Sequence, residues 1–226
     1  HKADHIVNQC CSMQDDFIKI NPKLRKNTSV IFNPLSNKII NYAENHDLSK
    51  IKKNDYLLCV GSLKKAKAFN YAIEGFARIA KHFPKLRLKI VGEGKLEKQL
   101  KKIAMDLGIE SRVDFEGFQK DIIPFYLYAR ATVLTSVYEG FPNVLIESIL
   151  LGTPVVSFDC PSGPSEIIEK GVNGFLVEYQ NIEDLKNQLY SVLLTKFYIK
   201  KMNKTVKKYY PKQIIQKYDR LLKSFQ

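Results

Sequence analysis

Residues 132–158 read TVLTSVYEGFPNVLIESILLGTPVVSF, and this stretch decides the fold. It begins and ends with short runs rich in Val, Leu and Phe that show little alternation of apolar and polar residues. Such runs are typical of strands that are buried on both faces of a parallel sheet. The largely apolar segment between them is long enough for a helix. The stretch therefore predicts a strand, a helix and a second strand, which is the repeating unit of an α/β sheet.

The same alternation extends from Tyr56 to Val177. It predicts strands at Tyr56–Gly61, Arg87–Val91, Val113–Glu116, Thr132–Ser136, Pro154–Phe158 and Gly174–Val177. One intervening helix has a single apolar stripe and ends at Gly108; the stripe comprises Leu96, Leu100, Ile103, Ala104 and Leu107. We therefore expect a Rossmann-like, doubly wound parallel sheet with right-handed crossovers. Ligands on such sheets bind beyond the carboxyl ends of the strands, so function is expected in the segments that follow them.

Both flanks of this block have weaker patterns. His5–Val7 and Ser12–Ile20 predict one more short strand and a helix. The apolar stretch Val30–Leu35 is broken by an Asn-Pro turn signal, and the polar residues 36–55 are expected to form a loop. After Pro211, an apolar stripe predicts a terminal helix that docks on another surface; it comprises Tyr210, Ile214, Tyr218, Leu221, Leu222 and Phe225.

Composition excludes several classes of protein. With 45% hydrophobic and 26% charged residues, the chain can bury a core and is not disordered. No apolar run is long enough for a transmembrane helix, and there is no secretory signal pattern. The four cysteines lack zinc spacing, which favours a reducing cytosol. The chain opens at His1 rather than at an initiating Met, so we expect a fragment or an excised domain.

The formal net charge of +13 is concentrated at the carboxyl end. Residues 196–226 hold ten Lys or Arg and one acid, Asp219, so this tail contributes 10 − 1 = +9. Such a tail is either a solvated face or a surface that binds anionic lipid, and its sequence leaves both open. It contains no recognisable nucleic-acid-binding module, so no nucleic-acid partner is expected.

The segment from Ser136 to Ser148 is the strongest candidate site. Pro142 suits the first turn of the helix, whose free N–H groups and dipole form an anion site. Glu139 lies in the turn before that helix, and Glu147 lies within its apolar part. A carboxylate there is costly unless it is bonded, and the paired hydroxyls of a ribose would satisfy it. A solvent-facing Glu on an ordinary helix fits the spacing equally well.

Three further segments follow predicted strands. The strand ending at Gly61 is followed by Lys67, which could reach a phosphate, although a basic surface turn with Lys64 and Lys65 is the simpler interpretation. Val91-Gly92-Glu93-Gly94 is another strand and glycine turn. Cys160–Ile168 is a loop entering a helix, where Glu166 suits ordinary helix-start chemistry. The chain has no Asp-x-Asp pair, P-loop or Gly-x-Gly-x-x-Gly, so neither a metal nor a cofactor is expected.

Together and in this order, these segments resemble the C-terminal domain of glycosyltransferase family four, a large retaining group with the GT-B fold. The matching motifs are Gly61-Ser62-Leu63 with Lys67, Val91 to Gly94, Phe115-Glu116-Gly117, Ser136 to Phe141, Glu147-Ser148, Gly152 to Val156, Gly163 to Ile168, and Asn173 to Val177. The resemblance covers roughly residues 56–190. It implies that residues 1–32 are the last strand and helix of an N-terminal acceptor domain and that residues 33–55 are a linker and loop. Residues 56–195 would then be the nucleotide-sugar-binding domain, and residues 196–226 would be basic helices that dock back toward the N-terminal domain.

The resemblance also implies residue roles. Glu139 and Lys67 would be catalytic: Glu139 contacts the donor sugar, and Lys67 offsets the diphosphate charge as the leaving group departs. Glu147 would hold the ribose hydroxyls, and the base would rest near Phe118. The whole implied donor-binding set comprises Gly61, Ser62, Gly92, Phe118, Gly140, Phe141, Pro142, Asn143, Val144 and Glu147.

Two positions depart from the family pattern. Ser62 stands where the family usually has an Arg that binds the diphosphate. We expect the loss of this charged contact to weaken donor binding by roughly 1.5–3 kcal/mol unless Lys64 or Lys65 compensates. Ser148 replaces the usual Ala, which is a small change.

The resemblance implies a metal-independent retaining transfer of a hexose or N-acetylhexosamine from a nucleotide sugar, with a UDP-sugar expected, to a sugar or lipid-linked saccharide. The loop Cys160–Ile168 resembles that of bacterial enzymes that build lipid-linked oligosaccharide, lipopolysaccharide or capsule. We therefore expect a cytoplasmic protein held at the inner membrane by its basic tail, and a chain that is incomplete and inactive alone. The alternatives are a GT-B relative such as a UDP-sugar epimerase or a phosphorylase, and a non-catalytic nucleotide-binding module degenerate at Ser62.

Overall fold

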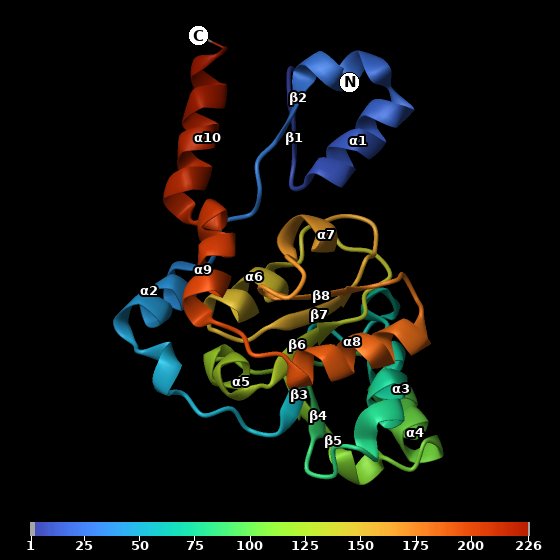
Figure 1. Cartoon of the computed structure of the whole chain (residues 1–226). Coiled ribbons are helices and arrows are strands. Elements are labelled where there is room, and N and C mark those ends of the chain that lie inside the picture. Colours follow the sequence, from blue (N-terminus) through green and yellow to red (C-terminus); the bar gives the residue numbers. More distant parts are fainter. Residues whose placement is uncertain (1–2, 226) are drawn as a thin grey trace.

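The computed structural model describes residues 3–225 and is built on a six-stranded parallel sheet (Figure 1). The strand order is β5-β4-β3-β6-β7-β8, so the direction of winding reverses between β3 and β6. The strands are β3 (Tyr56–Val60), β4 (Arg87–Val91), β5 (Val113–Gly117), β6 (Ala131–Leu134), β7 (Val155–Phe158) and β8 (Gly174–Val177). This is the order of a doubly wound Rossmann-like sheet, and the predicted fold class and six strands are confirmed.

Successive strand residues face opposite layers of helices. Leu57 packs into a core with α3 (Phe69–Ala80), α4 (Glu97–Asp106) and α8 (Ile182–Leu194), whereas its neighbour Leu58 packs into a second core. The second core is covered by α2 (Asn37–Asn45), α5 (Ile123–Tyr128), α6 (Asn143–Leu150) and α9 (Ile199–Val206). Both residues are fully buried. Two apolar layers explain why the strands read as continuous apolar runs.

A smaller sheet stands apart from the main one. It pairs β1 (Ile6–Asn8) in parallel with β2 (Thr28–Val30), and α1 (Cys11–Ile20) connects them. Figure 1 shows this unit on the far side of α7 (Pro164–Ile167) from the main sheet. The predicted strand at His5–Val7 and helix at Ser12–Ile20 are confirmed. Residues 1, 2 and 226 of the predicted segments 1–32 and 196–226 lie outside the described residues.

The predicted loop over residues 36–55 is wrong in its first half. Residues 37–45 form α2, and Leu48–Lys50 forms a short 3-10 turn. The helix buries Ile39 and Ile40 in the second core, with Ala43 partly buried beside them. These few apolar residues in a polar segment give a narrow stripe, and packing against the core stabilises a helix that local pattern does not predict.

The carboxyl end forms α9, a 3-10 turn at Lys207–Tyr209 and α10 (Pro211–Lys223). Of the predicted stripe on the terminal helix, Ile214 is buried, whereas Tyr218, Leu222 and Phe225 are 42%, 61% and 54% exposed. Within residues 3–225 the stripe is therefore fully buried only at its start, and at its end the Phe225 ring lies edge-on to the ring of His5, with 5.6 Å between the centroids. In the same part of the chain, no helix has the length and apolar character that a membrane crossing requires.

Candidate functional site

The carboxyl ends of β3 and β4 and the start of α6 enclose an open pocket at the point where the sheet winding reverses. Its volume is about 470 Å3, which lies in the range of small-molecule sites. The lining residues are Val60, Gly61, Ser62, Val91, Gly92, Glu93, Phe118, Gln119, Ile122, Tyr126, Val144 and Glu147. Six of the ten predicted binding residues are among them: Gly61, Ser62, Gly92, Phe118, Val144 and Glu147.

Glycines let the ends of β3 and β4 approach each other. Gly92 has φ +136°, and a Cβ there would lie 2.0 Å from the carbonyl oxygen of Gly61. Gly61 itself has φ +148°, and its Cβ would press on the side chain of Lys67. Any side chain at Gly92 would push these two turns apart, so the pocket floor depends on the absence of a side chain there.

Glu147 faces the pocket rather than bulk solvent. The hydroxyl of Tyr126, a buried residue of α5, donates a hydrogen bond to Glu147 Oε2 at 3.1 Å. Burial raises the pKa of Glu147, and the hydrogen bond from Tyr126 opposes that effect. The interpretation of Glu147 as a solvent-facing residue is therefore wrong. Tyr126 was not predicted, because nothing in its local sequence indicates that α5 lies across the pocket from α6.

Lys67 and Glu139 form a partly buried ion pair beside this pocket. Lys67 Nζ lies 2.6 Å from Glu139 Oε1, and the two side chains are 17% and 11% exposed. Ser136 Oγ donates to the same carboxylate oxygen at 2.5 Å. Thr135 Oγ1 donates to the carbonyl oxygen of Ala68, which ties the turn carrying Lys67 to the end of β6. The structure therefore brings the two predicted catalytic residues together.

The start of α6 offers free backbone donors. Within residues 3–225, the N–H groups of Gly140 and Phe141 have no hydrogen-bond partner. Pro142 occupies the N-cap, one position before the first helical residue, whereas the sequence suggested that it lies in the first turn. No side chain caps the helix. The Phe141 ring is buried against Phe32 and Tyr209, so this residue offers its backbone and not its side chain. Free N–H groups at a helix start attract anions.

The predicted binding residues Gly140, Phe141, Pro142 and Asn143 do not line the 470 Å3 pocket. In the sequence they lie between Glu139 and Val144, and Val144 lines the pocket. Asn143 is exposed. The arrangement is thus an open pocket bearing a carboxylate, with a polar turn and an ion pair at its side.

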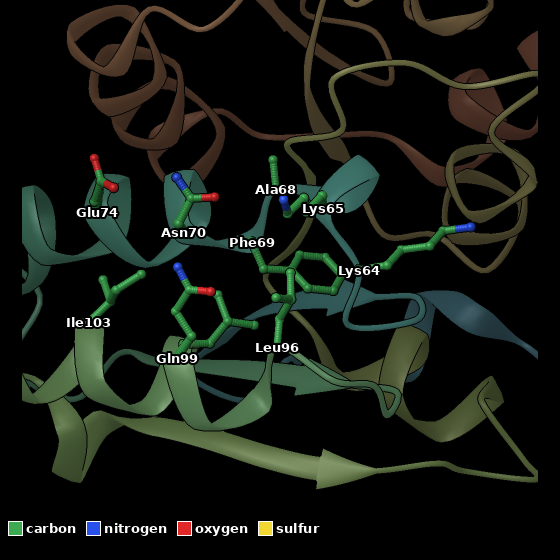
Figure 2. Close-up of a pocket in the computed structure, with 10 residues that line it drawn as sticks. Lys64, Lys65, Ala68, Phe69, Asn70, Glu74, Leu96, Gln99 and Ile103 are labelled. Atoms are coloured by element: carbon green, nitrogen blue, oxygen red, sulfur yellow. The ribbon is translucent and has the colours of Figure 1, made fainter.

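Lys64 and Lys65 are exposed, as the surface-turn interpretation expects, but Lys67 is not. The first two line a different hollow of about 230 Å3 between α3 and α4. In Figure 2, the Gln99 side chain extends from α4 toward α3, where Asn70 lies, and the Lys64 side chain extends away from the hollow. Neither lysine lines the pocket that holds Ser62.

Glu166 has a role that the sequence did not indicate. Its carboxylate accepts hydrogen bonds from the N–H groups of Cys11 at 2.9 Å and Ser12 at 3.2 Å, so it caps α1. Cys10 Sγ also lies 3.4 Å from the carbonyl oxygen of Gly140. These contacts hold the small β1–α1 unit against the loops of the main sheet. A carboxylate at a helix start is favoured by the free N–H groups and the helix dipole.

No group of three or more His, Cys, Asp or Glu that could hold a metal is found among residues 3–225. The metal-independent chemistry stays a prediction. Cys10, Cys59 and Cys160 are buried free thiols, and Cys11 is exposed.

The family model of glycosyl transferases group 1 matches residues 41–213, which is most of the chain. The chain belongs to this family. The match supports the resemblance to a GT-B family like glycosyltransferase family four.

Three relatives of this group 1 chain are glycosyltransferases by name. It is 37% identical over 155 residues to an uncharacterized glycosyltransferase of Haemophilus influenzae, covering 66% of this chain and 44% of the relative. It is 32% identical over 173 residues to lipopolysaccharide 1,6-galactosyltransferase of Salmonella typhimurium, covering 73% and 46%. A third relative, 29% identical over 206 residues, is an N-acetylgalactosaminyltransferase of Campylobacter jejuni whose named acceptor is a diphospho-undecaprenol-linked saccharide; it covers 91% and 54%. The chain spans about half the length of these relatives.

Solved structures agree with the fold. Lipopolysaccharide outer core galactosyltransferase WaaB, in its apo form, matches with a TM-score of 0.83 and 25% identity, over 99% of this chain and 62% of that one. HepE from Anabaena, in complex with UDP and glucose, matches with a TM-score of 0.81 and 23% identity, over 98% and 63%. The second likeness supports the fold alone.

Proposed function

We propose that this group 1 chain is the C-terminal, donor-binding part of a retaining glycosyltransferase that moves a hexose or N-acetylhexosamine from a UDP-sugar. The observation that carries the proposal is the 470 Å3 pocket with Glu147 on its wall, next to the Lys67–Glu139 pair. A carboxylate that accepts one hydrogen bond in a pocket can also accept from the paired hydroxyls of a ribose. The structural neighbour HepE is bound to UDP, which is the nucleotide that we propose for this chain.

In this proposal the base rests between Gly92 and Phe118, and Glu147 holds the ribose. The diphosphate lies at the free N–H groups of Gly140 and Phe141, with Lys67 beside it. As the bond between the sugar and the diphosphate breaks, negative charge grows on the leaving UDP. Lys67 and the backbone N–H groups offset that charge, which lowers the barrier. Glu139 contacts the transferred sugar and keeps Lys67 in position.

The proposed acceptor is a sugar or a lipid-linked saccharide of a bacterial surface polysaccharide. The names of the Salmonella and Campylobacter relatives support this class. We assign donor binding to residues 56–195, and acceptor binding to a domain to which residues 1–32 belong. Residues 33–55 would connect the two, and residues 196–226 would dock back on the acceptor domain, which fits the exposed apolar stripe on α10.

We further propose that the protein is cytoplasmic and binds the inner membrane through its basic tail. Within residues 3–225, no basic side chain from Lys196 onward lies within 4.0 Å of a carboxylate. Lys201, Lys204 and Lys208 line one hollow of about 440 Å3, and Glu169 is the acid beside them. The exposed ring of Tyr198 lies beside them, with Lys201 Nζ 5.5 Å from its centroid. Lysines interleaved with exposed apolar side chains suit an anionic lipid interface.

Sedimentation with vesicles tests the membrane proposal. The protein should pellet with vesicles that contain phosphatidylglycerol and stay in solution with pure phosphatidylcholine. Equal binding to both would overturn it.

The two alternatives are not favoured. A UDP-sugar epimerase or phosphorylase, and a non-catalytic module, would each share the fold, but the relatives named above are transferases. Measuring sugar transfer with and without a saccharide acceptor separates transfer from epimerisation.

Calorimetric titration tests the donor proposal. The protein is titrated with UDP, GDP, ADP and their sugars, alongside Glu147→Ala and the control Glu97→Ala on the surface of α4. UDP and UDP-sugars should bind, and Glu147→Ala should weaken binding roughly 10- to 100-fold, because a charged hydrogen bond contributes about 1.5–3 kcal/mol. Equal affinity in Glu147→Ala and wild type would remove Glu147 from the site.

A further inference from the structure

The end of β1 lies directly against the polar turn before α6. Gln9 follows β1, and its Oε1 lies 3.1 Å from the position that a Cβ on Gly140 would occupy. The next residue, Cys10, contacts the carbonyl oxygen of the same glycine. Two consecutive residues from the small β1–α1 unit thus flank the residue that follows Glu139.

The backbone around Gln9 is anchored on both sides. Before it, the buried Asn8 donates from Nδ2 to Thr28 Oγ1 at 2.5 Å, which fixes the end of β1. After it, the Glu166 carboxylate accepts from the N–H groups of Cys11 and Ser12. The position of Gln9 is therefore set by contacts to β2 and to α7, and only its side chain is free to rotate.

The Gln9 side chain is available to bind a ligand. It is exposed, and within residues 3–225 its amide forms no hydrogen bond. An amide offers two N–H donors and one acceptor oxygen, which matches the mixed donor and acceptor character of sugar hydroxyls. The adjacent N–H of Gly140 is also free. The Gln9 amide and the Gly140 N–H thus belong to neighbouring residues, and within residues 3–225 neither has a hydrogen-bond partner.

Gly140 leaves room for this approach. Its φ is not in the left-handed region, so its backbone conformation does not require a glycine. What the glycine supplies is space, and the Gln9 amide oxygen lies at the edge of that space. A ligand group bound next to Glu139 would therefore lie against the exposed Gln9 amide.

We propose that Gln9 is a specificity-determining residue that hydrogen-bonds a hydroxyl or acetamido group of the sugar being transferred. The inference rests on the proposed donor function, since Glu139 is there the residue that contacts this sugar. It adds a recognition group from outside the main sheet, supplied by the unit that Glu166 holds in place.

Calorimetric titration tests the inference. The ligands are UDP, UDP-glucose, UDP-galactose, UDP-N-acetylglucosamine and UDP-N-acetylgalactosamine. Gln9→Ala and Gln9→Met, which keeps the length but not the amide, should bind UDP as wild type does. Both should bind the preferred UDP-sugar about 2- to 10-fold more weakly, the effect of one hydrogen bond. Gln213→Ala, an exposed glutamine on α10, is the control and should change neither affinity.

Unchanged affinity of both Gln9 variants for every UDP-sugar would overturn the inference and leave the proposed function intact. Equal loss of UDP and UDP-sugar affinity would also overturn it, because Gln9 would then act on the fold and not on the sugar. Failure of the wild-type protein to bind either ligand would instead overturn the proposed function itself.

Discussion

Lys67 and Glu139 are less exposed than the partners of any other ion pair among residues 3–225. With Ser62 in place of the family's arginine, and with Lys64 and Lys65 on another surface, Lys67 is the cation nearest to the proposed diphosphate position. Its ammonium group is held by Glu139 and so needs little reordering when a ligand arrives. Charged groups that are already in position before the reaction contribute most to stabilising the charge that develops in the transition state.

Lys67→Ala should therefore weaken UDP binding roughly 10- to 100-fold, the effect of losing one charged hydrogen bond. Lys65→Ala is the matched control, because Lys65 belongs to the same 3-10 turn but lines the other hollow. Calorimetric titration with UDP measures both. Similar affinities in the two variants would contradict the role assigned to Lys67.

Lys53 is a second unusual cation, remote from the proposed donor site. Its Nζ donates to the carbonyl oxygen of Leu127 at 2.7 Å and to Thr153 Oγ1 at 2.5 Å. Burial lowers the pKa of Lys53 to about 8 from 10.5. Between these two pH values the unfolded chain binds the proton and the folded chain does not, so stability rises as pH increases through this window.

Relative to a Lys53→Met variant, the wild-type protein should therefore gain stability between pH 8 and pH 10.5, on the order of 3 kcal/mol in all. Urea denaturation of both proteins across this range measures the difference. The comparison cancels the cysteines and tyrosines that titrate in the same range. Parallel curves for the two proteins would show that Lys53 is not the group responsible.

At the scale of elements, the site depends on how closely the turns after β3 and β4 approach. The N–H of Gly61 donates to the carbonyl oxygen of Val91, and the N–H of Gly92 donates to that of Gly117. The turns after three neighbouring strands are thus linked side by side, and each ends in a glycine with positive φ. The floor of the pocket is therefore set by backbone and not by side chains.

Gly92→Ala should destabilise the fold by about 3 kcal/mol, because its Cβ would overlap the carbonyl oxygen of Gly61 and its φ is strained for an L-residue. Gly171→Ala is the control: it has φ +75° but nothing within 4 Å of its Cβ. It should cost only about 1 kcal/mol. Urea denaturation compares the two, and equal losses would show that the close approach of the turns is unimportant.

At the scale of the whole molecule, charge is distributed unevenly. Arg87, Lys89 and Arg130 pair with carboxylates around the sheet, whereas the lysines of α9 and α10 have no such partners within residues 3–225. Lys201 and Lys204 lie one turn apart on α9, and Lys208 in the following 3-10 turn lines the same hollow. A surface of unpaired like charges favours an anionic partner.

Reversing these three charges (Lys201→Glu, Lys204→Glu and Lys208→Glu together) should lower partitioning onto phosphatidylglycerol vesicles roughly 100-fold or more, at about 1 kcal/mol per lysine near the surface. The same reversal at Lys95, Lys98 and Lys102, which are exposed and have identical spacing, is the control. Sedimentation at low and high salt measures the effect, which should shrink as salt rises. Equal losses in both triple variants would indicate a response to net charge alone.

The sequence by itself determined the main sheet, because strands buried on two faces leave continuous apolar runs that are visible without any structure. It also indicated Gly61, Gly92, Lys67, Glu139 and Glu147 as candidate site residues, since ligand groups follow strand ends in a doubly wound sheet and the ordered motifs resemble a known family. The structure decided which of these residues meet: it joined Lys67 to Glu139 and turned Glu147 into the pocket.

Only the tertiary structure could decide the remaining contacts. Tyr126 of α5 donates a hydrogen bond to Glu147 of α6. Glu166 caps a helix more than 150 residues away in the chain. Gln9 lies against Gly140 from a separate sheet. α2 forms because Ile39 and Ile40 are buried in the second core. Local sequence carries periodicity and turn chemistry, but a contact between distant segments exists only once the intervening chain has folded and placed both partners.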